Sequence, residues 1–144
     1  MQIRKILVPV DFSHVEASVL ELAELLAKPH GGQLLIAHVQ DPPWGYKGDM
    51  YYGVAEPNSS ELNAMLHQIK PADATLQVDY RLLTGDPTGE LVRLADDEQI
   101  DLIVVSSHGR TGLSRMVMGS VAESIVRHAH CPVLVFKQRG KLNA

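Results

Sequence analysis

The residues best suited to chemistry lie in one polar segment, S106-S-H-G-R-T-G-L-S-R-M-V-M-G-S120. Its glycines Gly109 and Gly112 permit positive φ angles and let the backbone approach a ligand closely. Two arginines add positive charge, and Gly119 precedes Ser120 where a helix is expected to begin. Unpaired N–H groups and the dipole of a helix N-terminus favour a phosphate. The segment therefore predicts an anion-binding site.

Each part of this segment also has a purely structural interpretation. Ser120 and Glu123 match the S-x-x-E capping box, so Ser120 could serve only to cap the helix. The glycines could be simple turn residues, and His108 could either bond a phosphate or hold the loop together. A loop this long between a strand and a helix is uncommon unless it is functional, which favours the anion site.

Asp11 is the second candidate, because it directly follows a short apolar run that reads as a strand. A carboxylate in this position could accept a ribose hydroxyl or hold a divalent cation through water. It could equally help to cap the helix that follows. The residues alone leave these two roles open.

Apolar patterning indicates strands and helices in strict alternation, which predicts an α/β fold with a doubly wound parallel sheet. We expect one domain over residues 1–144, with residues 139–144 as a loose tail. The strict alternation of the third strand predicts an edge position, and the uninterrupted fourth run predicts a central strand. The expected strands are 3–10, 33–39, 76–82, 102–105 and 133–136, and the expected helices begin at Ser13, Ser60, Pro87 and Ser120.

Composition excludes several classes of function. A formal net charge of -4 argues against a dedicated nucleic-acid binder, which relies on lysine and arginine. Cys131 is the single cysteine and cannot form an intramolecular disulfide, so we expect a reducing, cytoplasmic location. No stretch of apolar residues is long enough to span a membrane, and the N-terminus does not resemble a signal peptide.

Enzymatic and metal chemistry find little support in the sequence. There is no P-loop motif and no G-x-G-x-x-G after the first strand. No nucleophile–base pair is evident, so we do not expect an efficient enzyme. The cluster His128-Ala129-His130-Cys131 has no standard zinc spacing. The aromatic-rich segment 41–60 could dock a partner, close over a ligand, or fold on its own side chains.

Over almost its whole length the chain resembles the universal stress protein family. The opening I6-L-V-P-V-D-F-S13 is similar to the family's first strand and aspartate, and L35-I-A-H-V39 is similar to its second strand. The run V104-V-S-S-H-G-R-T-G-L-S-R-M-V-M-G-S-V-A-E-S-I-V-R-H-A-H-C-P-V-L-V-F136 is similar to the family's signature end.

The nucleotide-binding branch of that family carries G-x-x-G, nine residues, and then G-[ST]. Gly109, the nine residues 110–118, and Gly119-Ser120 match this spacing, whereas Ser106 replaces the first glycine. The resemblance implies an adenine-nucleotide alpha-hydrolase-like fold with strand order 3-2-1-4-5. It also implies a ligand set that flanks the adenosine, meets the adenine through the backbone and wraps the phosphates: Pro9, Val10, Asp11, Val39, Ser106, His108, Gly109, Arg110, Gly119, Ser120 and Val121.

The function that the resemblance implies is that of an ATP-binding, nucleotide-responsive stress protein. ATP, with or without Mg²⁺, would order the polar segment and change which surface a protein partner meets. The family usually dimerises through its last strand, here Val133–Phe136, and an apolar edge strand invites such pairing. The alternatives are a nucleotide-independent dimeric interaction module and a slow ATPase.

Overall fold

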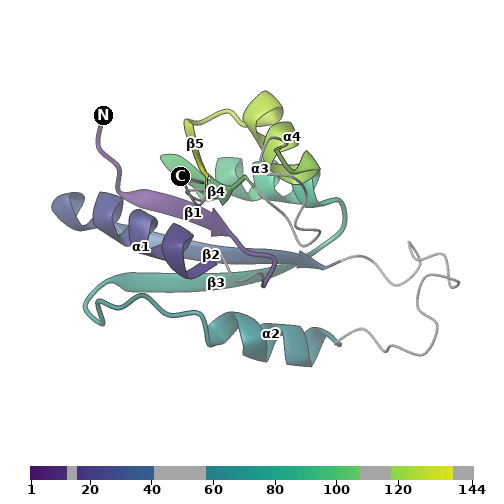
Figure 1. Cartoon of the computed structure of the whole chain (residues 1–144), viewed down its shortest axis with the longest axis horizontal. Coiled ribbons are helices and arrows are strands. Elements are labelled where there is room, and N and C mark those ends of the chain that lie inside the picture. The colour runs from purple at the N-terminus through teal and green to yellow at the C-terminus, as the bar shows by residue number, and fades with distance from the viewer. Residues whose placement is uncertain (13–15, 41–57, 108–117, 138–144) are drawn as a thin grey trace, which may run out of the picture.

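The computed structural model of the chain contains one five-stranded, all-parallel sheet (Figure 1). The structure describes residues 1–12, 16–40, 58–107 and 118–137. The strand order is β3-β2-β1-β4-β5, as predicted. The strands are β1 (Lys5–Pro9), β2 (Gln33–Gln40), β3 (Gln77–Thr84), β4 (Leu102–Ser106) and β5 (Val133–Phe136).

Helices cover both faces of the sheet, which confirms the doubly wound arrangement. Figure 1 shows α1 and α2 on one side of the strands and α3 and α4 on the other. The helices are α1 (Glu16–Ala27), the single 3₁₀ turn η1 (Lys28–His30), α2 (Ser59–His67), α3 (Pro87–Asp97) and α4 (Ser120–His128). Among the described residues, no helix is long and apolar enough to cross a membrane.

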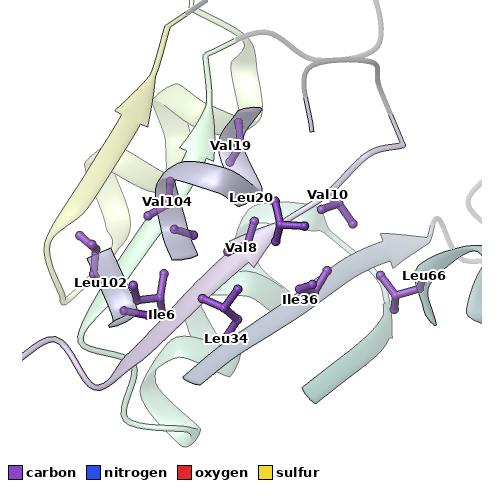
Figure 2. Close-up of a cluster of buried hydrophobic side chains, with 12 residues drawn as sticks. Ile6, Val8, Val10, Val19, Leu20, Leu34, Ile36, Leu66, Leu102 and Val104 are labelled. Atoms are coloured by element: carbon purple, nitrogen blue, oxygen red, sulfur yellow. The ribbon is translucent and has the colours of Figure 1, made fainter. Parts of the chain in front are cut away.

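Two hydrophobic clusters fill the space between the sheet and its helices, because successive strand side chains point to opposite faces. The first cluster joins Ile6, Val8, Leu34 and Ile36 to α1 and is drawn in Figure 2. The second cluster joins the alternate strand residues to α3 and α4; its fully enclosed members are Leu7, Ala37, Ile103 and Ile125. The three central strands are therefore covered on both faces, as the unbroken apolar run of β4 predicts for that strand.

Helix starts depend on single capping residues, and the predicted start of α2 is wrong. Asp86 caps α3 as expected, because its Oδ2 accepts the N–H of Gly89 at 2.8 Å and Pro87 follows it. The cap of α2 is Asn58 rather than Ser60, since Asn58 Oδ1 accepts the N–H of Glu61 at 2.9 Å. Asn58 has an extended backbone, so Ser60 already lies within the helix.

Charged side chains at the start of β1 pair with one another. Glu98 follows α3 and accepts Lys5 Nζ at 2.7 Å and Arg81 Nη2 at 3.3 Å. The hydrogen bond and charge of Lys5, with the weaker help of Arg81, lower the pKa of Glu98. Asp101 accepts the backbone N–H groups of Arg4 and Lys5, each at 3.0 Å. These charges hold β1 to the loop before β4.

Candidate functional site

The strand order places a topological switch point between β1 and β4. The connection after β1 leads to β2 on one side, and the connection after β4 leads to β5 on the other. In open α/β sheets the two connections diverge here and leave a crevice outside the carboxyl ends of the strands, where ligands bind. Pro9 and Ser106 are the last residues of these two strands. Two of the predicted ligand residues thus lie at the ends of the two strands that flank this switch point.

The chain leaving β1 is fixed to β2 through both backbone groups of one residue, Val10. Val10 N donates to Ala37 O at 2.8 Å, which continues the ladder one residue beyond the strand. Val10 O accepts Nδ1 of His38 at 2.7 Å, so this ring nitrogen carries the proton. His38 is only 7% exposed. These bonds place Asp11, which is half-buried, directly after a rigid anchor.

Phe12 then turns the chain with a φ of +65°. A positive φ is costly for a residue that has a Cβ atom and persists only where the surroundings enforce it. Here the Phe12 ring packs on the His38 ring, with centroids 4.5 Å apart and planes inclined at 49°. His38 thus holds the connection after β1 through both its ring nitrogen and its ring face. The sequence alone does not show these partners of His38; a histidine within a predicted buried strand is the one signal that it gives.

We predict that His38→Leu destabilises the protein by about 1–3 kcal/mol, because the carbonyl of Val10 loses its donor in a buried setting. His38→Asn places an amide N–H near the position of Nδ1 and should recover part of the loss. Urea unfolding of both variants measures the difference. Equal stabilities of the Leu and Asn variants would show that ring packing, and not the hydrogen bond, matters here.

The connection after β4 is closed by two backbone hydrogen bonds of Ser107. Its N–H donates to Phe136 O, the last residue of β5, at 2.8 Å. Its carbonyl accepts the N–H of Gly119 at 2.6 Å. Ser107 therefore joins three elements: it follows β4, and its backbone bonds the end of β5 and the start of α4.

The N-cap residue of α4 is a glycine, so no side chain caps this helix. Gly119 is the N-cap, with φ −59° and ψ 150°, and Ser120 is already the first helical residue. The capping-box interpretation of Ser120 is thus wrong, and Glu123 instead accepts Arg127 Nη2 at 2.9 Å. The next N–H groups, beginning with those of Ser120 and Val121, have no partner within the helix. Ser120 and Val121 are exposed and Gly119 is half-buried, so an anion can reach this end of the helix.

The structure brings most of the predicted ligand residues to one edge of the sheet. Val39 lies near the end of β2 and packs against the second hydrophobic cluster. The residues that the structure places at this edge are Pro9, Val10, Asp11, Val39, Ser106, Gly119, Ser120 and Val121. Three further predicted residues, His108, Gly109 and Arg110, lie outside the described residues, as do Ser13, segment 41–57 and residues 138–144.

The His128–Cys131 cluster takes separate partners. His128 Nδ1 donates to Ser124 O at 2.9 Å, and His130 Nδ1 lies 2.9 Å from Asp96 Oδ2. Burial and the nearby Asp96 carboxylate raise the pKa of Cys131, so its thiol stays protonated. In the part of the chain that the structure describes, no three potential ligands come together as a metal site.

The parallel sheet with helices on both faces and a switch point between β1 and β4 defines a doubly wound α/β protein. The chain belongs to the universal stress protein family, whose pattern matches residues 2–137. It is 30% identical to universal stress protein MJ0577 of Methanocaldococcus jannaschii, over 94% of this chain and 96% of that protein. The solved structure of MJ0577 superposes with a TM-score of 0.80 and covers 98% of this chain and 100% of that one.

Two further solved structures share the fold at lower identity. One is a universal stress protein in complex with cAMP, at 22% identity and a TM-score of 0.62, covering 94% of this chain and 98% of that one. The other is the universal stress protein of Archaeoglobus fulgidus in complex with dAMP, at 21% identity and a TM-score of 0.61, again covering 94% and 98%.

Proposed function

We propose that this chain is an ATP-binding regulatory protein that acts as a homodimer. The adenosine lies in the crevice between β1 and β4, beside Asp11 and the backbone of Val39. The phosphates lie on the N-terminus of α4, against Gly119 and Ser120. ATP, alone or with Mg²⁺, is here a ligand rather than a substrate for rapid turnover.

The observation that carries this proposal is the bare N-terminus of α4. The cap residue has no side chain, and its own N–H is already bonded to Ser107 O. Among the described residues, the cap therefore offers no side chain to the N–H groups that follow it. A phosphate would satisfy these groups and interact favourably with the helix dipole.

The related structures support an adenylate as the occupant. Two proteins of this fold are described in complexes with cAMP and dAMP, which share the adenine and one phosphate. The polar segment of this chain matches the spacing of the family's nucleotide-binding branch apart from Ser106, and the resemblance to that branch implies ATP. We therefore extend the proposal from adenylates in general to ATP.

The dimer would form through β5, at the edge of the sheet opposite β3. Its four apolar residues are half-buried, and Val126 on the neighbouring α4 is 47% exposed. A second copy would cover this apolar edge and pair its backbone groups. Because Phe136 is bonded to Ser107, the proposed interface adjoins the proposed phosphate site. Nucleotide binding would thus change the surface that a protein partner meets in the cytoplasm.

The test is to purify the protein without added nucleotide, denature it, and identify what is released by chromatography and mass spectrometry. We expect ATP or another adenylate at close to one equivalent per chain. For protein stripped of nucleotide, saturating Mg-ATP should raise the melting temperature, since ligand that binds only the folded state stabilises it. No released adenylate and no shift with Mg-ATP would refute the proposal in favour of a nucleotide-independent interaction module.

A further inference from the structure

The hydroxyl of Ser107 is buried and has no hydrogen-bond partner among the described residues. Ser107 as a whole is only 6% exposed. Its backbone is fully used, since the N–H bonds Phe136 and the carbonyl bonds Gly119. The unsatisfied group is therefore the side-chain oxygen alone, at the junction of β4, β5 and α4.

An unpaired buried hydroxyl is unfavourable, because it has lost its bonds to water without gaining others. Such groups are rare in folded proteins, and each calls for a reason. An alanine in this position would leave nothing unsatisfied. The serine thus lowers the stability of the unliganded protein, which suggests that the hydroxyl has its partner in another state.

The position of Ser107 places its side chain close to the N-terminus of α4. Ile103 and Val105 of β4 pack in the cluster that faces α3 and α4. Ser107 lies one residue beyond β4, and its N–H bonds Phe136 O as that of Ile103 bonds Pro132 O, so the alternation continues and places Ser107 on the same side of the sheet as α4. Its carbonyl is bonded to the N-cap of α4, the end that would bind a phosphate. Because both backbone bonds fix the main chain, rotation about χ1 changes the direction of the hydroxyl without moving the backbone.

We propose that the Ser107 hydroxyl donates a hydrogen bond to a phosphate oxygen bound at the N-terminus of α4. This inference rests on the proposed function and adds a side-chain donor to it. Oxygens of a phosphate are strong acceptors, and a bond to a charged acceptor exceeds a neutral one in strength. The hydroxyl then lowers the stability of the unliganded protein and gains its hydrogen bond only when a phosphate binds.

The experiment compares wild-type protein with Ser107→Ala, both stripped of nucleotide. The melting temperature of the unliganded variant should rise by about 2–4 °C, because a buried unpaired group is removed. Its affinity for Mg-ATP, measured by titration calorimetry, should fall about tenfold, the loss expected for one hydrogen bond to a charged group. If the Ser107 hydroxyl served only to stabilise the fold, the melting temperature of unliganded Ser107→Ala would fall instead.

Ser124→Ala is the matched control, because Ser124 lies on α4 with its hydroxyl 3.4 Å from His128 Nδ1. It should leave the affinity for Mg-ATP unchanged. If the wild type binds and Ser107→Ala binds equally well, the Ser107 proposal is wrong and the proposed function stands. A lower melting temperature of the unliganded Ser107→Ala would also overturn it, since the hydroxyl would then have an internal partner such as a buried water. If the wild type itself binds no adenylate, both proposals fall together.

Discussion

Gly119→Asp should weaken the binding of Mg-ATP by at least about 100-fold while leaving the fold intact. The substitution places a carboxylate at the N-cap of α4, where we propose that the phosphates lie. Two like charges about 4 Å apart near a protein surface repel by roughly 4 kcal/mol, and each 1.4 kcal/mol is a factor of about ten in affinity. Titration calorimetry on nucleotide-free protein measures the loss.

The backbone of Gly119 makes this a clean test. Its φ of −59° and ψ of 150° are open to any residue, and aspartate is a favoured N-cap. The stability of the unliganded variant should therefore match or slightly exceed that of the wild type. Gly119→Asn has nearly the same shape and capping ability without the charge, and it should retain most of the affinity. Undiminished binding by the aspartate variant would contradict our placement of the phosphates.

Leu7→Ala should lower the free energy of unfolding by about 3–4 kcal/mol. Leu7 lies in the central strand β1, is 0% exposed, and sits between Leu35 of β2 and Ile103 of β4. Removing a buried leucine side chain loses its transfer free energy and leaves a cavity that neighbouring strands cannot fill. Domains of this kind are stable by only about 5–15 kcal/mol, so the loss is a large share of the total.

Leu25→Ala is the matched control for this prediction. Leu25 lies on α1 and is 66% exposed, so the same chemical change should cost less than about 0.5 kcal/mol. Chemical denaturation of both variants gives the two free energies. Similar losses for Leu7 and Leu25 would mean that the sheet is not the core that the structure describes.

The fold could be predicted because its signals are local. An unbroken apolar run identified β4 as a central strand, alternation identified β3 as an edge, and Asp86-Pro87 gave the start of α3. The full strand order came from the family resemblance. Where several neighbouring residues could serve as the N-cap of a helix, the sequence alone does not show which one does. Asn58 rather than Ser60 caps α2, and Gly119 rather than Ser120 is the N-cap of α4.

The less predictable part of the site depends on contacts between distant segments. His38 gains its role only because β2 lies beside β1, which brings its ring to Val10 O and Phe12. Ser107 becomes an unsatisfied buried group only because β5 and α4 take both of its backbone groups. Motif spacing predicts the glycine and serine positions of the candidate site, but it gives no signal for His38 or for the Ser107 hydroxyl.

The central claim is that an adenine nucleotide binds at the carboxyl edge of the sheet with its phosphates on α4. Amide chemical shifts of isotope-labelled, nucleotide-free protein, recorded during a titration with Mg-ATP, test it most directly. We predict saturable shifts for Asp11, Val39, Ser120 and Val121, and none for Arg4, Lys5 and Glu98 near the start of β1. The absence of shifts at α4, or larger shifts at the start of β1, would contradict the account.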